Sequence, residues 1–600
     1  MRAIIVLMLV LVGVDGLSVE VSPLSEFYVP ASINGPAEIA AGAGEQFDFD
    51  KDAKVAYVVG ETGFVNILSY ADYANPELLE TVDIGGTGTD IEVCGGLVAI
   101  AMEGLPTKQD DGKIKFYKAY ISGEGIVEQY EVTTMPLPDM IHFSDDCTIM
   151  VVANEGEAAV QNATLVNPPG GVTVLKWDGD LMQAPTQVNL TFDEFNGNEL
   201  FKPDGSGVLW SYRPDNEAEA NNQSSFQQDL EPEYVAIAED NSMAFVILQE
   251  NNAVAFVSLG DTPKIEAIAP LGLKSWKDLK IDASNRDSGV NMVSGYEIYG
   301  AYQPDTIKTF SRDGKHYLIT ANEGDAKEYL FDNEAEDEYW IEERRGADFE
   351  VFAPSVSEEM KSMLADQAQL GRLKFLDKVG LDENGMHERF IAMGGRSVSI
   401  FEMTVDGANS KAELKWDSGD EVEAKHAELD PNGEKGLFNP EQVDPASDLP
   451  ADGFDGRSDD KGVETETVEL GMCGGAQLLF VGNERASSLF IYDISDFPGS
   501  DPTLLTVVPM ANPLEQTNKT WQQLFEDREL GIVDPESMKY VPVGDEEGIL
   551  LVAGAVSGTV SAYQLKCDGA GAIVASDSAA TTPVTVFWSV LIAFLSAIWQ

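Results

Sequence analysis

The chain has 600 residues, of which 103 are acidic and 38 basic, so its formal net charge is −65. A surface this negative cannot neutralise phosphate groups, which excludes nucleic-acid binding and argues against adsorption to anionic lipid. Hydrophobic residues make up 44% of the chain, enough for a large core, and this length favours a fold that grows by repetition. The charge favours cations and basic partners, with solubility alone as the plain alternative.

The N-terminus carries a targeting signal over residues 1–16. The basic residue Arg2 is followed by an apolar run from Ala3 to Val14 and then by the small residue Gly16. This pattern is typical of a secretory signal peptide and is too short for a membrane-spanning helix. We therefore expect the rest of the chain to lie outside the cell.

A strand pattern recurs between residues 30 and 566. Each copy is a Val/Ile/Ala-rich strand, a tight turn that usually contains a glutamate, and a second alternating strand. A proline, an acid and an apolar residue precede many copies, as in Pro304-Asp305-Thr306-Ile307. Clear copies are residues 55–67, 97–104, 149–157, 244–257, 317–325 and 478–492, and copies without the acid are 390–401 and 550–563.

Repeated units of four antiparallel strands predict an all-β fold, a β-propeller over residues 30–566. We expect seven blades if the copy near Phe390 completes the unit that begins at Gln303, and eight if that copy stands alone. An array of β-sandwiches is the alternative, but it does not explain why the acid returns at the same place in each unit.

Three insertions interrupt the repeats. Residues 325–369 are acidic and contain a helical period over 357–369, which predicts a short helix. Residues 418–462 are rich in Asp, Gly and Pro and are expected to form a loop. Residues 183–229 are expected to be a surface segment.

The C-terminus has the pattern of a lipid-anchor signal. Residues 567–583 form a linker with small residues at the expected attachment site, Ser576, Asp577 and Ser578. The apolar tail over residues 584–600 lacks a following basic residue, which favours a removable GPI signal over the alternative, a single transmembrane helix. Both place the protein on the extracellular side of the plasma membrane.

Glycosylation and cysteine usage agree with this compartment. An even number of cysteines permits two disulfides, and Cys94 and Cys147 are expected to pair because both stand just before apolar strands. The glycosylation sequons are at Asn162, Asn189, Asn222 and Asn518, and the cysteines are Cys94, Cys147, Cys473 and Cys567.

Acids recur at two places in each unit, at the start of the first strand and in the following hairpin. In a propeller these two places lie on one face, so about a dozen carboxylates, among them Asp90, Glu61 and Glu103, should meet around the channel. Crowded carboxylates repel unless cations offset them, and calcium prefers oxygen ligands. The alternative is that these acids cap backbone amides in turns. The predicted metal ligands are Asp139, Glu155, Glu233, Glu250, Asp305, Glu323, Asp325, Glu466, Glu484 and Glu536.

A separate acidic loop contains Asp455, Asp459, Asp460 and Glu464 between glycines. It is similar to a calcium loop but lacks the EF-hand spacing, and the alternative is a solvated loop. GxSxG, HExxH, Walker and GxGxxG motifs are absent, and the four histidines are scattered. We therefore predict no catalytic residue and no site for an organic cofactor.

Several long motifs resemble the choice-of-anchor I domain family, which includes mesenchyme-specific cell-surface glycoproteins. The motifs are DLEPEYVAIAEDNSMAFVILQENNAVAFV (229–257), YQPDTI (302–307), LITANEGDAKEY (318–329), GGRSVSIFE (394–402), RSDDKG (457–462) and FVGNERASSLFIYDIS (480–495). The resemblance spans about residues 30–565. It implies a secreted propeller with a variable C-terminal anchor and an association with calcium uptake or mineral deposition. Gly554-Ala555 departs from the family's Asn-Glu, and Glu464-Thr-Glu466-Thr from its Pro-Glu-Gly, so we expect an incomplete rim.

Together these features predict a membrane-anchored acidic glycoprotein that binds calcium or other divalent cations, in biomineralisation or adhesion. The alternatives are a metal-dependent extracellular phosphoesterase and a protein-interaction scaffold. Expected partners are divalent cations and basic extracellular proteins or mineral. Nucleic acid is excluded, and membrane contact is expected only through the anchor.

Overall fold

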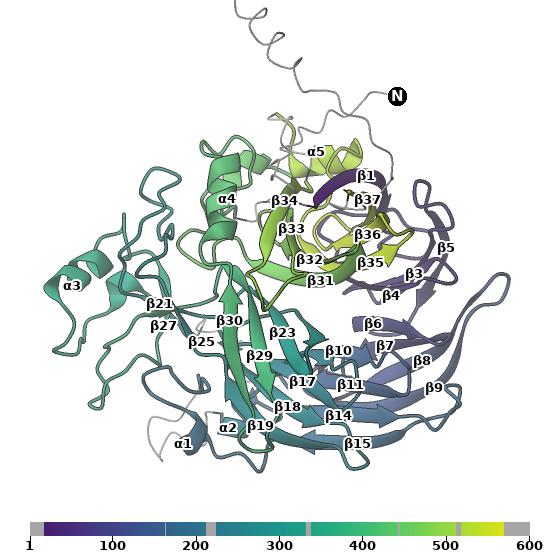
Figure 1. Cartoon of the computed structure of the whole chain (residues 1–600), viewed down its shortest axis with the longest axis horizontal. Helices are drawn as coiled ribbons and strands as arrows, with labels where there is room; N and C mark the ends of the chain where they lie inside the picture. Colours follow the sequence, from purple (N-terminus) through teal and green to yellow (C-terminus); the bar gives the residue numbers. More distant parts are fainter. Residues whose placement is uncertain are drawn as a thin grey trace, which may run out of the picture.

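The computed structural model describes residues 17–161, 164–211, 224–331, 338–441, 444–511 and 518–568 (Figure 1). These residues contain seven four-stranded antiparallel sheets. In six of them the strand that comes first in the chain is the one nearest the centre of the molecule, and in the seventh the strand that comes first in the chain is the outermost. The innermost strands contact one another in a closed ring, from blade 1 through blade 7 and back to blade 1. The fold is therefore a β-propeller, as predicted, and the number of blades is seven.

The blades follow the chain in order. Blade 1 contains β2 (Gln46–Asp50), β3 (Val55–Val59), β4 (Phe64–Ser69) and β5 (Glu77–Asp83). Blade 2 contains β6 (Gly88–Cys94), β7 (Leu97–Met102), β8 (Asp111–Ile121) and β9 (Gly125–Pro136). Blade 3 contains β10 (Pro138–Phe143), β11 (Ile149–Asn154), β14 (Gly171–Lys176) and β15 (Thr186–Thr191). Blade 4 contains β16 (Pro232–Ile237), β17 (Met243–Leu248), β18 (Ala253–Ser258) and β19 (Lys264–Pro270).

The last three blades include pairings between distant segments. Blade 5 contains β22 (Ile307–Arg312), β23 (Lys315–Asn322), β29 (Ser397–Thr404) and β30 (Lys411–Asp417). Blade 6 contains β31 (Thr465–Cys473), β32 (Ala476–Asn483), β33 (Ser488–Asp493) and β34 (Thr503–Pro509). Blade 7 contains β35 (Pro535–Pro542), β36 (Glu547–Gly554), β37 (Thr559–Asp568) and β1 (Ser18–Tyr28). The copy near Phe390 thus completes blade 5, because β29 pairs with β23.

Blade 7 closes the ring with the two ends of the described chain. Strand β1 pairs antiparallel with β37, with Ser18 opposite Asp568 and Tyr28 opposite Thr559. The propeller therefore begins at Ser18 and not at the expected residue 30. The buried Val21 packs in one hydrophobic cluster with Leu565 and Tyr563, which holds β1 on the blade.

The core lies between neighbouring blades. The second strands of blades 2, 3 and 4, which are β7, β11 and β17, are buried along their whole length. A neighbouring blade covers each face of these strands, so side chains on both faces must be apolar. This explains why β7, β11 and β17 are continuous apolar runs and not alternating ones. One cluster joins blades 3 and 4 through Val151, Val174, Val235 and Val246, all buried.

The first insertion, residues 325–369, is part of a small unit beside the propeller, which also includes residues 273–301 and 374–392 (Figure 1). Its sheet has the order β20 (Leu273–Ser275), β21 (Tyr299–Ala301), β28 (Ile391–Ala392), β27 (Lys374–Leu376) and β26 (Glu343–Arg345). With η1 (Gly346–Asp348) and α3 (Glu358–Ala365), this insertion unit has its own buried core, which includes Trp276, Phe375 and Phe390. Helix α3 confirms the helix predicted in residues 357–369, and Ser357 caps it by accepting a hydrogen bond from the Met360 amide.

The second insertion, residues 418–462, is more ordered than expected. It contains α4 (Glu421–Leu429) and η2 (Pro450–Gly453), so the prediction of a loop was wrong in part. Helix α4 is fixed by a buried ion pair of 2.8 Å between Glu423 and Arg396. The third insertion, residues 183–229, contributes β15 to blade 3 as well as α1 (Gly197–Leu200) and α2 (Phe226–Asp229).

The remaining elements are short. Two hairpins, β12 (Ala159–Gln161) with β13 (Thr164–Val166) and β24 (Glu328–Phe331) with β25 (Glu338–Ile341), lie side by side through β12 and β24. Helix α5 (Trp521–Glu526) precedes blade 7. Within the described ranges, no helix is both long and apolar enough to span a membrane.

The strand directions define two faces. The start of each first strand and the hairpin between the second and third strands lie on one face, which we call the acidic face. The opposite face contains the paired residues Ser18 and Asp568 and both disulfides, Cys94–Cys147 and Cys473–Cys567, with Cα–Cα distances of 5.6 and 5.8 Å.

Several predicted sites fall outside the described residues. These are the signal peptide, Asn162, Asn222, the attachment residues Ser576, Asp577 and Ser578, and the apolar tail. Of the other sequons, Asn189 is exposed on β15 and Asn518 is exposed shortly before α5.

Candidate metal-binding face

β-Bulges direct the first set of acids toward the channel. In blades 3, 4, 6 and 7 the register of the first strand shifts where Asp139, Glu233, Glu466 and Glu536 stand. A bulge adds one residue to the strand and changes the direction of its side chain. With Asp305 of blade 5, these residues are the strand-start acids.

A left-handed residue begins most of these strands. Leu137, Gln303 and Asp534 have φ angles of 47°, 41° and 55°, and each is followed by a proline and then by the strand-start acid. Glu464 has a φ of 50° two residues before Glu466, although no proline follows it. The recurring Pro-acid step is therefore the local signal for the kink that positions the carboxylate.

The second set, the hairpin acids Glu155, Glu250, Glu323 and Glu484, follows the second strands of blades 3 to 6. Glycine allows the tight turn after Glu323, because Gly324 has a φ of 95° and a Cβ there would lie 2.3 Å from the Gly394 nitrogen. This close approach brings the insertion unit next to the hairpin.

The acids of blades 3 to 5 line a cavity of about 540 Å³. Eight carboxylates and a single basic side chain, Lys327, surround it. Six of the predicted ligands are among its lining residues. The lining is Asp139, Glu155, Glu157, Glu231, Glu233, Gln249, Glu250, Asp305, Asp325, Ala326 and Lys327.

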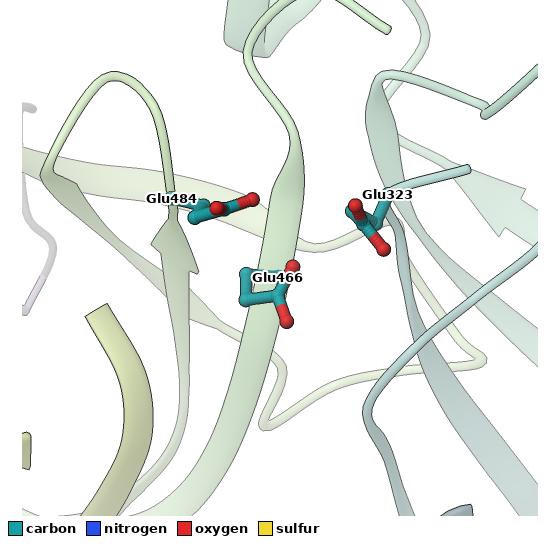
Figure 2. A group of neighbouring side chains, drawn as sticks. All are labelled: Glu323, Glu466 and Glu484. Atoms are coloured by element: carbon teal, nitrogen blue, oxygen red, sulfur yellow. The ribbon is translucent and has the colours of Figure 1, made fainter. Parts of the chain in front are cut away.

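Three further predicted ligands, Glu323, Glu466 and Glu484, form what we call the three-glutamate cluster. Each offers one carboxylate oxygen, and these oxygens all lie within 4.8 Å of one another. Figure 2 shows the three side chains around one space, with Glu466 at the start of β31 and the other two after β23 and β32. Glu536, the last of the ten, interacts electrostatically with Asp305 and Glu323, so it belongs to the same face.

Basic residues from insertions and loops balance the hairpin acids. Lys327 forms an ion pair with Glu231 and lies 3.9 Å from Glu250. The Lys461 ammonium lies 2.5 Å from Glu323, and the Arg485 guanidinium lies 3.0 Å from Glu484. The strand-start acids form no salt bridge with any basic residue that the structure describes, so the uncompensated charge is concentrated near the channel.

Four buried carboxylate oxygens on this face have no hydrogen-bond partner among the described residues: Oε1 of Glu231 and Oε2 of Glu233, Glu250 and Glu466. Glu233 and Glu466 are each only 7% exposed, and the Oε2 atom of each has no hydrogen-bond partner. A buried charge without a partner is unfavourable, so these positions favour either a proton or a bound cation.

The pKa values on this face follow from burial and from neighbouring charge. Burial, followed by repulsion from nearby carboxylates, raises the pKa of Asp139 to about 7. Burial also raises the pKa of Glu323 to about 7, although Lys461 acts in the other direction. The pKa values of Glu233 and Glu466 are raised well above the usual range by burial and by adjacent acids. Burial would raise the pKa of Glu464 too, but Lys461, Arg457 and Arg485 lower it to about 2.

Blades 1 and 2 contribute less than the repeat suggests. Asp90 is buried and accepts hydrogen bonds from the amides of Ile91 and Ile141 at 2.8 and 2.9 Å, so it supports the strands as in the turn-support alternative. Glu61 is exposed and Glu103 is half-buried. In blade 7, Gly554-Ala555 leaves the hairpin without an acid, as expected, while Glu536 supplies the strand-start acid.

The loop around Asp455 to Glu464 is neither solvated nor arranged as a calcium loop. Asp459 lies 2.6 Å from both Arg345 and Arg372, and Asp460 lies 2.9 Å from Lys374. These carboxylates have basic partners on the insertion unit and join it to the propeller. The sequence repeat does not indicate these partners, because they come from segments without a repeat.

Polar side chains close the channel below the acidic face. Lys539 lies 3.0 Å from Asp48, and Lys308 lies 3.2 Å from Glu469. The residual space there is about 10 Å³, too small for a hydrated ion. The acidic face is therefore a cup with a closed floor.

The fold and this cup define an all-β protein, a seven-bladed propeller with a crescent of buried and half-buried carboxylates on five adjacent blades. The family model of the choice-of-anchor I domain matches residues 45–497, and the chain belongs to this family. A mesenchyme-specific cell surface glycoprotein of Strongylocentrotus purpuratus is 24% identical, over 75% of this chain and 78% of the relative. Gigasin-3a of Magallana gigas is 29% identical, over 33% of this chain and 66% of the relative.

Solved structures with a similar outline include hydrazine synthase of Kuenenia stuttgartiensis, with 11% identity and a TM-score of 0.38 over 88% of this chain and 98% of that one. The Cps50 (Swd1) β-propeller domain of Myceliophteria thermophila has 8% identity and a TM-score of 0.41, over 90% and 99% of the two chains. Sqt1 of Saccharomyces cerevisiae has 7% identity and a TM-score of 0.35, over 92% and 99%.

Proposed function

We propose that this protein is a membrane-anchored cell-surface glycoprotein that binds calcium on the acidic face of its propeller. The observation that carries the proposal is the three-glutamate cluster. Calcium takes oxygen ligands at 2.3–2.6 Å, so oxygens bound to one ion lie within about 5 Å of one another. The separation of at most 4.8 Å among Glu323, Glu466 and Glu484 meets this condition.

The charges around the cluster also support a divalent cation. Glu323 accepts hydrogen bonds from Lys461 at 2.5 Å and Gln249 at 2.8 Å, which fix its position. Glu466 has no such donor at Oε2, and its pKa is raised by burial and then by Asp305, Glu323 and Glu536. A doubly charged ion would replace the proton on Glu466 and offset this repulsion.

The cell-surface part of the proposal rests on the sequence signals and on the sea-urchin relative, whose name describes a cell surface glycoprotein. We extend the proposal to a use of the bound calcium in adhesion or mineral deposition. A phosphoesterase needs a nucleophile or an activated water beside the metal. No observation on the acidic face favours that alternative.

Calorimetric titration of the secreted ectodomain with calcium tests the proposal. We expect Glu466→Gln to weaken calcium binding at least tenfold, because it removes a charged ligand and keeps the shape of the side chain. The matched control is Glu297→Gln, an exposed acid paired with Lys277, which should leave binding unchanged. Absence of calcium heat at millimolar concentration in the unmodified ectodomain, or equal binding by Glu466→Gln, would reject the site.

A further inference from the structure

In the cavity of blades 3 to 5, the hairpin acid of blade 3 lacks, among the described residues, the basic partner that the hairpin acids of the next three blades have. The hairpin acids of blades 4, 5 and 6 each face a basic side chain of the same chain, Lys327, Lys461 and Arg485 respectively. Glu155, the hairpin acid of blade 3, is different, because the charged groups that act on it most strongly are all carboxylates. Lys108, at the rim, forms an ion pair with Glu157 and interacts more weakly with Glu155.

The cavity also contains a buried acceptor without a partner. Glu233 lines it, is 7% exposed, and has no hydrogen-bond donor at Oε2. Asp139, across the same cavity, forms no salt bridge with any described basic residue and is repelled by Asp305, Glu157 and Glu250. Of the eight lining carboxylates, Glu157 pairs with Lys108, Glu231 and Glu250 pair with Lys327, and Asp325 pairs with Lys461. The other four, Asp139, Glu155, Glu233 and Asp305, form no salt bridge with a basic residue that the structure describes.

The shape of the cavity favours an organic cation over a single metal ion. Its volume of about 540 Å³ is many times the roughly 30 Å³ that one water molecule occupies in the liquid. Among the described residues, only the three-glutamate cluster brings three carboxylate oxygens within 4.8 Å of one another, and none of its members lines the cavity. The cavity carboxylates are thus dispersed, and they suit ammonium groups on a flexible stem.

We propose that this cavity binds lysine side chains of a basic extracellular polypeptide. Lys327 and Lys461 show how such a ligand would bind, because each comes from an insertion that passes over the cup and places its ammonium group among acids of the propeller. The partner's lysine takes the corresponding place beside Glu155, Glu233 and Asp139, and its methylene stem fills the volume. This inference goes beyond calcium binding and uses different residues.

The test measures binding of a short peptide of alternating glycine and lysine to the ectodomain at 150 mM salt, where long-range attraction is screened. We expect the double variant Asp139→Asn, Glu233→Gln to weaken peptide binding at least tenfold. These substitutions keep side-chain shape and remove only charge, so folding should be retained, and calcium titration of the same variant checks this. The same peptide with Nε-acetylated lysines should not bind, because acetylation removes the ammonium charge.

Two controls separate this proposal from the calcium site and from diffuse attraction. Glu466→Gln and Glu297→Gln should each change peptide binding less than twofold. Equal binding by the double variant, equal binding of the acetylated peptide, or an equal loss in Glu297→Gln would overturn the proposal. Calcium heat that survives Glu466→Gln and disappears in the double variant would assign the cavity to metal and would also overturn it. If the unmodified ectodomain binds calcium but does not bind the peptide, the lysine proposal alone is contradicted and the calcium proposal stands.

Discussion

At the scale of single residues, the acidic face combines two kinds of carboxylate. The hairpin acids of blades 4 to 6 are held by Lys327, Lys461 and Arg485, whereas the strand-start acids have no such partner among the described residues. The Pro-acid steps and the glutamate-containing turns predicted the positions of these acids, because turns and bulges are local in sequence. The basic partners could not be predicted, because they lie in insertions far along the chain and follow no repeat.

The raised pKa values lead to a prediction about stability and pH. Asp139 and Glu323 both have pKa values of about 7, above the usual range for carboxyl groups. The folded state therefore binds their protons more tightly than the unfolded state does, and the stability gained from them is lost as the pH rises through 7. Without calcium, we expect the unfolding free energy to fall by about 1 kcal/mol per group between pH 6.5 and pH 8.

Thermal unfolding of the ectodomain in EDTA across this pH range measures the effect. The double variant Asp139→Asn, Glu323→Gln should show a flatter dependence, because amides do not titrate. Saturating calcium at pH 8 should raise the Tm of the unmodified ectodomain. A Tm that stays constant or increases from pH 6.5 to pH 8 in EDTA would contradict the assignment of these pKa values.

At the scale of elements, the insertions are fixed by buried ion pairs rather than by repeated strands. Arg396 is 2% exposed, and besides Glu423 it donates to the backbone carbonyls of Asp282, Ser458 and Asp460. This one guanidinium connects blade 5 with α4, the insertion unit and the 455–464 loop. Composition alone indicated a solvated loop here, because Asp and Gly favour loops and the buried basic partners lie outside the segment.

We predict that Arg396→Met destabilises the ectodomain by about 3–5 kcal/mol, because Glu423 would remain buried without its charged partner. Denaturant unfolding gives this difference directly. Lys277→Met is the matched control, since it removes an exposed pair with Glu297 and should leave stability nearly unchanged. Equal stability of the two variants would show that the buried pair does not hold the insertions.

At the scale of the whole molecule, the ring is closed by the two ends of the described part of the chain. The number of blades could be predicted only as seven or eight from the sequence, because the paired strands β23 and β29 of blade 5 are separated by a long insertion. The contribution of β1 to blade 7 was missed, because its partner β37 lies at the other end of the described chain. A repeat is recognised from successive copies along the chain, and β1 is a single strand far in sequence from the other strands of its blade.

Ring closure through β1 leads to the next prediction. Val21 is buried against Leu565 and Tyr563, while the adjacent Glu20 is exposed. Val21→Asp should destabilise the protein by about 3 kcal/mol, because it buries an unpaired charge and removes an apolar contact. Glu20→Asp, at an exposed position of the same strand, should be neutral. Limited proteolysis and thermal unfolding report the two variants, and equal protease resistance would contradict closure by β1.

The pairing of Ser18 with Asp568 also determines which way the cup points. Both residues lie on the propeller face that carries the disulfides, so a tether attached to either end would keep that face toward the surface to which the protein is attached. The carboxylates of the acidic face would then point away from that surface, into the medium around the cell. Soluble ions and neighbouring macromolecules could reach them there without passing the lipid.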